Sequence, residues 1–500
     1  MNIQFWAATD IGRVRDHNED NFLVDKRLNL FVVCDGMGGH AAGEVASAVC
    51  VRMVRDVIAN NRKLIEHSTA NPGDLKARKK ILKLLEYAIQ EACTRVFDLA
   101  QSDQERRGMG TTCSLMMLVG LRCFIAHVGD SRIYLARRAQ VHQLTEDHSL
   151  VNEMIRQGKL SEEEAVKSPY KNAITRAVGV YESVEVDTLT FELSSGDRLL
   201  LCSDGLSMYT DLETLGQYLK SGYGAVASQS EMKHISEALL RYANSCGGKD
   251  NVTAVVVAID DEKELKTEDV HLTMETIRQI PLFQFLSYKE LVRIINVTQK
   301  RTVSAGEVVV REGEAGNELY IILRGDFVVE SAKSQLAVLG SGRHFGEMAL
   351  IDEQVRSATV SSKGSGQLLV ITRPNFYDLL RKDANLAVKL LWNFVQTLSS
   401  RLRDGQQFDG SVRRRHHQRP PTSTSSHPLS INTSKTPPIG LHEADLLLAN
   451  PSLDSARSAI ADHIKSVQED IGEDITLPGL SAEELGIDGL LALPAKQGSE

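Results

Sequence analysis

The chain reads FVVCDGMGGH over residues 31–40, where an apolar run of strand length ends in an Asp-Gly pair. The same pattern returns in 199-LLLCSDGL-206, and the loops 15-RDHNED-20 and 247-GGKDNVT-253 add further carboxylates. One such pair is ordinarily a turn, because Asp bonds its own backbone and Gly accepts positive φ. Four carboxylate loops without a Cys or His pair at ligand spacing instead indicate an oxygen-only site for Mg²⁺ or Mn²⁺, and disfavour zinc.

Around these loops, runs of strand length alternate with stretches of helical periodicity. Two stretches repeat apolar residues on one helical face, and the second follows Asp74, which suits an N-cap. The faces are Val45, Val49, Met53 and Val57, and Leu82, Leu85, Ile89, Ala92 and Val96. Early and late strands with helices between them predict a mixed domain of packed layers.

The composition is typical of a folded chain without a membrane span. Of 500 residues, 42% are hydrophobic and 25% are charged, and at roughly 150 residues per domain this length predicts about three units. The net charge of −9 argues against general nucleic-acid binding. The N-terminus lacks the apolar core of a secretory signal, and the most apolar stretch, 111–129, is interrupted by Gly120 and Arg122. Seven cysteines without a C-x-x-C motif argue against a disulfide framework and predict a cytoplasmic protein.

Composition also divides the chain. The stretch 411–440 holds five of the twelve prolines and few large apolar side chains, so it cannot repay the entropy of ordering. A charged stretch after 252-VTAVVVAI-259 predicts a second, shorter linker. The expected divisions are a catalytic domain at 1–262, a linker at 263–276, a second domain at 277–403, a disordered basic linker rich in Pro and Ser at 404–440, and an acidic tail at 441–500.

Eight motifs follow one another in the order of a known enzyme family. They are RDHNED (15–20), DGMGGHAAGE (35–44), GMGTT (108–112), VGDSR (128–132), LTEDHS (144–149), NAITRAVG (172–179), CSDGL (202–206) and GGKDNVT (247–253). Through them, residues 1–260 resemble the metal-dependent serine/threonine protein phosphatases of type 2C, in their bacterial form. The resemblance implies an α+β fold in which two antiparallel sheets lie face to face with helices outside them, in four αββα layers.

The resemblance also assigns roles to the loop carboxylates. It implies that Asp35 bridges two metal ions, that the Gly36 carbonyl binds one of them, and that Asp204 and Asp250 complete the other shell. Two such ions share a water, lower its pKa and neutralise the phosphoryl oxygens during in-line attack. The residues that support these ligands are Glu19 and Asp20.

Arg15 resembles the family's phosphate-holding arginine, whose planar fork grips two oxygens; a surface salt bridge is the alternative. Two positions depart from the family. Met37 stands where eukaryotic members carry a histidine used as leaving-group acid, and the nearby His40 is our candidate for proton transfer, with a structural loop histidine as the alternative. Asp130 would share a third metal with an acidic residue that is here Met208, so we expect a weak or absent third site and low turnover.

A second resemblance begins at residue 277. A helical stretch precedes short β-like runs with glycine turns, which predict a small antiparallel barrel. Within it, 345-FGEMALIDEQVRSATV-360 resembles the phosphate-binding cassette of cyclic-nucleotide-binding domains, and 277–403 fits the whole jelly-roll domain with closing helices near 374–380 and 384–402. The resemblance implies a ligand site of Gly346, Glu347, Ala349, Arg356 and Ser357.

These residue types suit a cyclic phosphate. Gly346 lets the backbone approach, the following turn points N–H groups at an anion, and Arg356 can pair with the exocyclic oxygens. Glu347 would accept the ribose 2′-hydroxyl. Val355 replaces the usual proline, so we expect a less rigid loop and a lower affinity. Ser357 discriminates poorly between the bases, and cAMP is favoured over cGMP. In the alternative, the FGE-x-AL motif is barrel packing and Arg356 a solvated charge.

The acidic tail, 441–500, carries 12 acidic and 3 basic side chains. A helix start at Asn450-Pro451 precedes one apolar stripe, and a capping box opens the stretch 481–493. Both segments could dock on a protein partner, and a disordered solvating tail is the alternative. The stripe is Leu453, Ala456, Ile460, Ile464 and Val467.

Together these features predict a cytoplasmic phosphatase that hydrolyses phosphoserine and phosphothreonine in substrates of a Ser/Thr kinase pathway. It would use two Mn²⁺ or Mg²⁺ ions and be regulated by its cyclic-nucleotide sensor, without nucleic-acid or membrane partners. We expect ligand binding to move the helices after residue 374 and hence their contact with the catalytic domain. Residues 150–176 resemble the flap that sorts substrates, or are a connector. Two rivals stay open: a pseudophosphatase scaffold, and an active phosphatase whose sensor is a ligand-free docking or dimerisation barrel.

Overall fold

The computed structural model describes residues 2–38, 42–138, 140–220, 227–260, 264–331, 334–351 and 354–413. Three predictions concern residues outside this set: His40, the linker beyond residue 413, and the acidic tail at 441–500. Within the described part, no helix combines the length and apolar content needed to cross a membrane.

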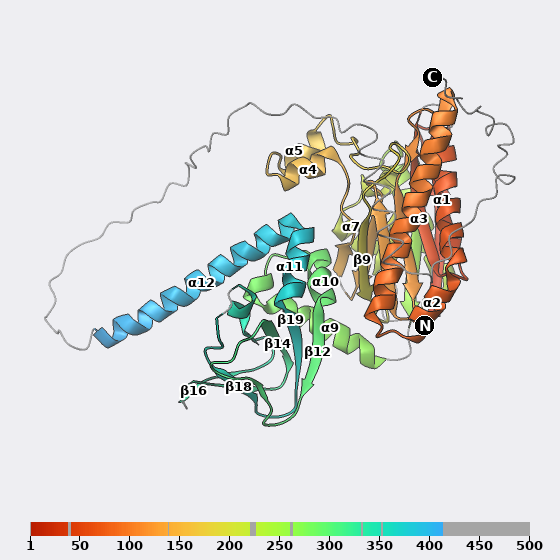
Figure 1. The fold of residues 1–500 in the computed structure, drawn as a ribbon. Helices are drawn as coiled ribbons and strands as arrows, with labels where there is room; N and C mark the ends of the chain where they lie inside the picture. The colour runs from red at the N-terminus through yellow and green to blue at the C-terminus, as the bar shows by residue number, and fades with distance from the viewer. Residues whose placement is uncertain are drawn as a thin grey trace, which may run out of the picture.

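Two antiparallel sheets lie face to face in the first half of the chain (Figure 1). One has five strands in the order β1-β11-β10-β7-β8, and the other has six, in the order β2-β3-β5-β6-β9 with β4 paired to β3. The strands are β1 (Asn2–Asp10), β2 (Asp20–Asp25), β3 (Leu30–Met37), β4 (Gly110–Thr111), β5 (Cys113–Val119), β6 (Arg122–Val128), β7 (Arg132–Arg137), β8 (Gln140–Gln143), β9 (Asp187–Glu192), β10 (Arg198–Cys202) and β11 (Val252–Asp260).

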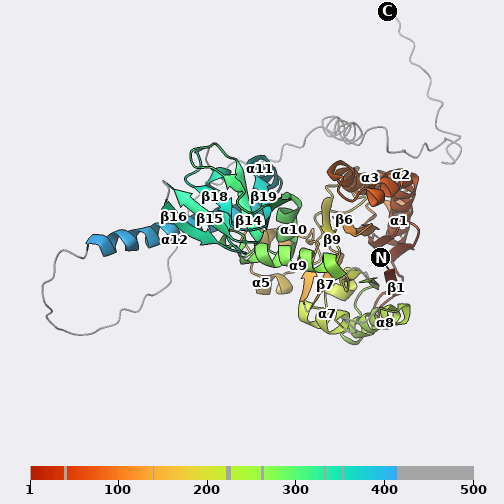
Figure 2. The same ribbon diagram turned by 90° about the horizontal axis from the view of Figure 1, so that it is seen from below.

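Helices cover the outer face of each sheet (Figure 2). Along β3, Phe31 and Val33 pack between the sheets, whereas Leu30 and Val32 pack with α1 and α3, because successive side chains of a strand point to opposite faces. Helices α7 and α8 cover the other sheet. The predicted antiparallel α+β fold is confirmed, with layers in the order helix, sheet, sheet, helix. The helices are α1 (Ala42–Asn60), α2 (Arg62–Ala70), α3 (Leu75–Ser102), α4 (Leu150–Arg156), α5 (Glu162–Lys167), α6 (Asp204–Ser207), α7 (Leu212–Leu219) and α8 (Gln229–Ser245).

The two predicted helical faces fare differently. Helix α3 begins as expected, since Asp74 accepts hydrogen bonds from the backbone N–H groups of the first turn. In α1, however, the buried face is centred on Ala46, Cys50 and Val54, one position round from the predicted stripe, of which only Val57 is fully buried.

The second half contains two four-stranded antiparallel sheets, in the orders β12-β19-β14-β17 and β13-β18-β15-β16. It is therefore rich in antiparallel strands, as the sequence predicts. Helices extend across two of the expected boundaries. The expected linker at 263–276 is helical from Glu264, and the last helix continues to Arg413, beyond the expected boundary at residue 403. The elements are α9 (Glu264–Gln279), α10 (Tyr288–Asn296), β12 (Thr298–Val303), β13 (Val308–Val310), β14 (Glu318–Arg324), β15 (Phe327–Ser331), β16 (Ser334–Leu339), β17 (His344–Phe345), β18 (Thr359–Ser362), β19 (Gly366–Thr372), α11 (Arg373–Lys382) and α12 (Ala384–Arg413).

Helix α10 joins the second half to the first. One hydrophobic cluster continues from between the catalytic sheets through α9 and α10 to β14 and β19. Asn296 Nδ2 donates to Thr190 O at 2.7 Å, and the ammonium of Lys289, a residue only 4% exposed, lies 3.3 Å from Asp187 Oδ2. The contact therefore combines apolar packing with buried polar interactions to β9.

Candidate active site and nucleotide pocket

Aspartates from distant loops meet at one edge of the facing sheets. Asp20 at the start of β2 pairs in register with Asp35 near the end of β3. Asp204 opens α6 directly after β10, and Asp250 lies just before β11, which pairs with β10. Asp130 follows β6 and lies close enough to influence both Asp35 and Asp204. The structure thus brings together the carboxylates that the sequence singled out.

Burial and mutual repulsion raise the pKa of these carboxyl groups. Burial, followed by the charges of Asp20 and Asp204, raises the pKa of Asp35 well above its ordinary range. Burial raises the pKa of Asp20 to about 7, with Asp204 and Asp250 adding to it. Burial and the charge of Asp250 raise the pKa of Asp204 to about 6, and burial and the charge of Asp204 raise that of Asp130 to about 7. These carboxyl groups can all be ionised at once only when positive charge nearby compensates their negative charges.

Two buried oxygens of this group accept no hydrogen bond from the described residues: Asp20 Oδ1 and Asp204 Oδ1. The other oxygen of Asp20 accepts from Ser203 Oγ at 2.7 Å and from Thr253 Oγ1 at 2.6 Å, which fixes the side chain. A buried acceptor without a donor is costly, and hard divalent cations bind through such oxygens. The donor set therefore fits Mn²⁺ or Mg²⁺.

Glycine is required where the aspartate loops touch. The Gly36 N–H donates to Glu19 O at 3.1 Å, and a Cβ at Gly36 would lie 2.6 Å from that oxygen and still closer to Gly43 O. A Cβ at Gly205 would collide with the carbonyl oxygen of Asn251. These close backbone approaches hold the loops that carry the aspartates against one another.

Arg15 and Glu19 lie at the edge of the carboxylate group. Arg15 Nη2 donates to Asp250 Oδ2 at 2.7 Å, and its side chain is 48% exposed. The hydrogen bond with Asp250 raises the pKa of Arg15, and the charges of Glu19 and Asp35 add to this effect. Burial raises the pKa of Glu19, against the opposing charge of Arg15. Arg15 is therefore half-exposed and forms an ion pair beside the carboxylates. The salt bridge that was the alternative is present, and it lies where a phosphate-holding arginine is expected.

The two positions of the expected third metal site differ in burial. Asp130 follows Gly129, which has a φ of 107° and donates its N–H to His148 Nδ1 at 3.1 Å. Met208 ends the short helix that Asp204 begins, and it is 43% exposed. Of the two positions, only Asp130 therefore offers a carboxylate to a third metal ion.

Sequence reasoning missed the residues that hold the aspartates in place. Ser203 and Thr253 fix Asp20, as described above. Asn251 Oδ1 accepts the Glu19 N–H at 2.8 Å, while its amide donates to two backbone carbonyls. The signal was present in CSDGL and GGKDNVT, where hydroxyl and amide side chains flank the carboxylates.

The fold also gathers three thiols that are far apart in the sequence. Cys34, Cys50 and Cys113 place their sulfur atoms within 4.8 Å of one another, and all three are buried. Their elements are β3, α1 and β5, so no spacing along the chain could reveal this cluster.

The segment 150–176 forms α4 and α5 and contacts the second half. With the Asn385 amide oriented to satisfy its neighbours, Arg156 Nε on α4 donates to Asn385 Oδ1 at 2.6 Å. Figure 1 shows α4 and α5 beside the first turns of α12. The segment resembling a flap is therefore linked to the closing helix of the second half.

Arg356 is the centre of a second polar site. Its Nη1 donates to Glu318 O at 3.0 Å and to Gly346 O at 3.5 Å. Its buried Nη2 lies 3.7 Å from Glu318 Oε2 and has no hydrogen-bond partner among the described residues. Gly346 adopts a left-handed φ of 79°, and a Cβ there would lie 2.5 Å from the guanidinium. The buried Glu347 follows in the same turn. This arrangement leaves a guanidinium donor available for an anion at a glycine turn.

The other two residues of the predicted ligand set lie differently. Ala349 is buried, and its carbonyl accepts from Arg373 Nε at 2.7 Å. Ser357 is exposed. The structure therefore brings Gly346, Glu347, Ala349 and Arg356 together and leaves Ser357 at the surface.

Comparison with known proteins matches both halves. The protein phosphatase 2C family model matches residues 13–240, and the cyclic nucleotide-binding domain model matches residues 300–383. Serine/threonine phosphatase stp of Listeria innocua is 38% identical over 260 residues, which cover 51% of this chain and 95% of that protein. Protein phosphatase PhpP of Streptococcus pneumoniae is 36% identical over 257 residues, covering 51% and 96%.

Solved structures align over the same half. The serine/threonine phosphatase PstP/Ppp of Mycobacterium tuberculosis is 32% identical with a TM-score of 0.45, covering 52% of this chain and 99% of that one. A PstP catalytic domain in complex with 2 manganese ions is 33% identical with a TM-score of 0.43, again covering 52% and 99%. The extent and identity of the matches to the curated relatives, together with the two family matches, show that the chain belongs to the protein phosphatase 2C family of serine/threonine phosphatases and carries a cyclic nucleotide-binding domain after its catalytic domain.

Proposed function

We propose that this phosphatase uses two Mn²⁺ or Mg²⁺ ions held by the aspartate group to hydrolyse phosphoserine and phosphothreonine in protein substrates. The observation that supports this most strongly is the pair of buried, unpartnered oxygens on Asp20 and Asp204 among carboxyl groups of raised pKa. When bound, such ions activate water and neutralise charge on phosphoryl oxygens. Its substrates would be proteins phosphorylated in a Ser/Thr kinase pathway. Its cysteine content is the basis for proposing that it acts in the cytoplasm.

The chain's own residues would divide the remaining work. Asp35 would bridge the ions, with the Gly36 carbonyl on one side and Asp204 and Asp250 on the other. Asp20, which the sequence cast in a supporting role with Glu19, has a fixed side chain and an available oxygen, so we assign it a direct part in holding an ion. Arg15 would orient the substrate phosphate with the half-exposed guanidinium beside Asp250.

The full chain is expected to release phosphate from a phosphothreonine peptide only in the presence of Mn²⁺ or Mg²⁺. A chelator should stop the reaction and added Mn²⁺ should restore it, because the carboxylates need compensating charge. A phosphate-release assay across a metal titration measures this. Release that persists in chelator would contradict the metal centre, and no release at any metal concentration would favour the pseudophosphatase scaffold.

Met208→Asp is expected to raise turnover severalfold at saturating Mn²⁺. The new carboxylate, at the end of the short helix that Asp204 begins, would supply the ligand for a third cation site that a thioether does not provide. Met208→Leu is the matched control, since it keeps the bulk without adding a ligand. Equal rates for all three proteins would show that a missing third site does not limit turnover.

We further propose that the second domain binds a cyclic nucleotide, with cAMP favoured over cGMP. Arg356 Nη2 is available for the exocyclic oxygens, and the Gly346 turn allows a close approach of the phosphate. Glu347 is placed in the same turn to accept the ribose hydroxyl. Ala349 would contribute backbone at the pocket, and Ser357, being exposed, would approach only the base edge.

Helix α10 is the element through which we propose that nucleotide binding reaches the catalytic domain. On one side it is held by the closing helices: Glu290 accepts from Lys389 Nζ of α12 at 2.9 Å, and Arg293 pairs with Asp383 between α11 and α12. On the other side, Lys289 pairs with Asp187 of β9. A movement of the closing helices would therefore shift α10 against β9.

Beyond β9, a chain of contacts leads toward the carboxylates. Asp187 Oδ1 accepts from Arg176 Nη1 at 3.2 Å and lies 3.6 Å from His148 Nε2. His148 in turn accepts the N–H of Gly129, the neighbour of Asp130. A coupling of about 1–3 kcal/mol along this route corresponds to a 5–150-fold change in a binding constant.

Arg356→Ala is expected to weaken cAMP binding by about 10–100-fold, the range for a hydrogen bond to a charged group. Calorimetry on the full chain with cAMP and cGMP measures this, with the exposed Arg381→Ala as the matched control. Any change in phosphatase rate caused by nucleotide should disappear in the same variant. A wild-type chain that binds neither nucleotide would favour the ligand-free docking barrel, and binding without a change in turnover would contradict the proposed coupling.

A further inference from the structure

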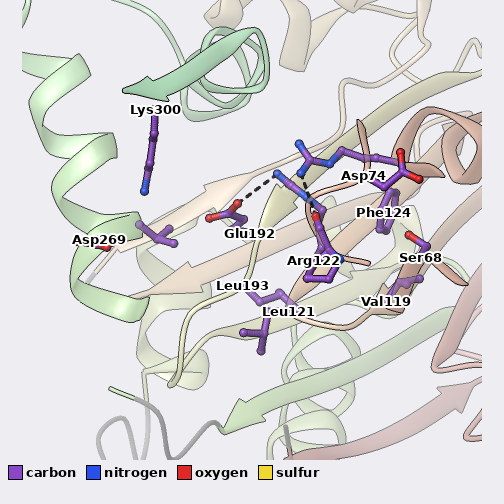
Figure 3. A pocket seen from close by; sticks show the side chains of 13 residues that line it. Ser68, Asp74, Val119, Leu121, Arg122, Phe124, Glu192, Leu193, Asp269 and Lys300 are labelled. Carbon is purple, nitrogen blue, oxygen red and sulfur yellow. Dashed lines mark hydrogen bonds and ion pairs between the residues drawn. The ribbon is translucent and has the colours of Figure 1, made fainter. Parts of the chain in front are cut away.

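A cavity of about 270 Å³ lies where the catalytic domain meets the second domain. Its walls come from the start of α3, the β5–β6 turn and the end of β9 on one side, and from α9 and β12 on the other (Figure 3). A neighbouring cavity of about 430 Å³ shares Arg78, Arg122, Glu192, Val270 and Lys300 with it. Neither cavity includes a residue of the aspartate group or of the nucleotide pocket.

Two arginines in this wall have buried donors without acceptors. Arg78 Nε and Arg122 Nη1 make no hydrogen bond within the described part of the chain. The Arg122 side chain is only 12% exposed, and its Nη2 lies 3.7 Å from Glu192 Oε1, beyond hydrogen-bond distance. Burial, followed by the charge of Arg78, lowers the pKa of Arg122 to about 10, and burial lowers the pKa of Arg78. Neighbouring buried cations with unused donors are unfavourable unless an anion satisfies them.

Charged side chains of both signs line the cavity. Lys300 extends into it from β12, opposite Arg122 (Figure 3). The carboxylates of Asp74 and Asp269 are already engaged, the first by the N-terminus of α3 and the second by Arg324 at 3.0 Å. Three cationic side chains therefore line the cavity together with three carboxylates, yet Arg78 Nε and Arg122 Nη1 find no acceptor among the described residues.

The rest of the wall is apolar. Phe124 is buried, and Val119, Leu121 and Leu193 also line the cavity (Figure 3). A ligand here could therefore place a doubly charged group among the three cations and an apolar group against these side chains. The volume fits a small molecule and excludes a folded partner.

We propose that this interdomain cavity binds a small phosphate monoester with an apolar or aromatic group, held by Arg78, Arg122 and Lys300. The oxygens of a phosphate dianion can accept from both guanidinium groups at once, including the two donors that lack an acceptor. Because Lys300 belongs to the second domain and the arginines to the catalytic domain, the ligand links the two. This site is separate from the catalytic centre and from the cyclic-nucleotide pocket.

Phenylphosphonate is the probe, because its P–C bond resists hydrolysis and its charge and ring match the cavity. We would titrate it calorimetrically into the full-length Arg15→Ala/Arg356→Ala variant in chelator at alkaline pH, so that the other two phosphate sites are disabled. One molecule is expected to bind per chain and to raise the unfolding midpoint. Benzenesulfonate, with a single charge, and inorganic phosphate, without a ring, are expected to bind more weakly.

Adding Lys300→Ala to that background is expected to weaken phenylphosphonate binding about tenfold, the loss of one charge-assisted contact. Lys300 is exposed, so the variant should fold, and the exposed Lys363→Ala is the matched control. Arg122→Gln should lower the affinity for phenylphosphonate still more. Absence of binding in the starting background, or equal affinities with and without Lys300, would overturn the proposal. Its failure would leave the proposed catalytic function untouched, since activity is not the readout.

Discussion

Asp35→Ala is expected to lower the rate of phosphate release from a phosphothreonine peptide on the order of 10⁴-fold, as removal of a residue essential to the catalytic unit does. Asp35 is the aspartate on which the charges of Asp20, Asp204, Asp130 and Asp250 all act, so no neighbour can replace its central position. The measurement is kcat at saturating Mn²⁺, together with the Mn²⁺ concentration that gives half the maximal rate.

The same substitution is expected to leave the metal-free protein folded and no less stable. Burial and like charge both oppose ionisation of Asp35, so the substitution removes a buried group whose charged form is unfavourable when no cation is present. Thermal unfolding in chelator separates this outcome from misfolding. Asp98→Ala, an exposed carboxylate on α3, is the control and should keep full activity. A variant of Asp35 that retained more than about a tenth of the activity would show that the aspartate group is not the reaction centre.

The aspartate loops could be predicted because the information is local. Each carboxylate lies within two residues of the end of a strand, and antiparallel pairing brings such ends to one edge of the sheet, as it does for Asp20 and Asp35. Hydroxyls such as Ser203 escaped notice because their role depends on which strand lies beside them, and that pairing is not encoded at short range. The thiol cluster of Cys34, Cys50 and Cys113 escaped for the same reason.

The helix α9, in the stretch expected to be a linker, was not foreseen because it carries a weak pattern. Its sequence begins with charged residues, and within the part whose side chains the structure describes, residues 269–279, the buried ones are Thr273, Met274, Thr276 and Ile277. Tertiary contacts with the catalytic domain and with β14 stabilise a helix whose own periodicity predicts a linker. The interface itself depends on pairs such as Lys289 and Asp187, and a residue's partner across an interface cannot be inferred from one sequence.

Arg137→Ala is expected to destabilise the full chain by about 3–5 kcal/mol, because it leaves a buried charge without its partner. Arg137 is 8% exposed and donates to both oxygens of Asp197, at 2.8 Å and 2.6 Å, while Asp197 is fully buried. The same guanidinium donates to Tyr288 Oη of α10 at 2.7 Å, so it connects the catalytic core with the second domain. The free energy of unfolding from a urea titration measures the loss.

Two companion variants separate the buried charge from the interdomain hydrogen bond. Tyr288→Phe removes only the latter and should cost about 1 kcal/mol. Arg137→Ala/Asp197→Ala removes both charges and should be more stable than Arg137→Ala alone, because the penalty in the single variant comes mainly from the isolated carboxylate on Asp197. Two results would contradict this: a loss of less than about 1 kcal/mol in the single variant, or a double variant that is less stable than the single one. Either would mean that water can replace the ion pair and that the junction depends on apolar packing around α9 and α10 instead.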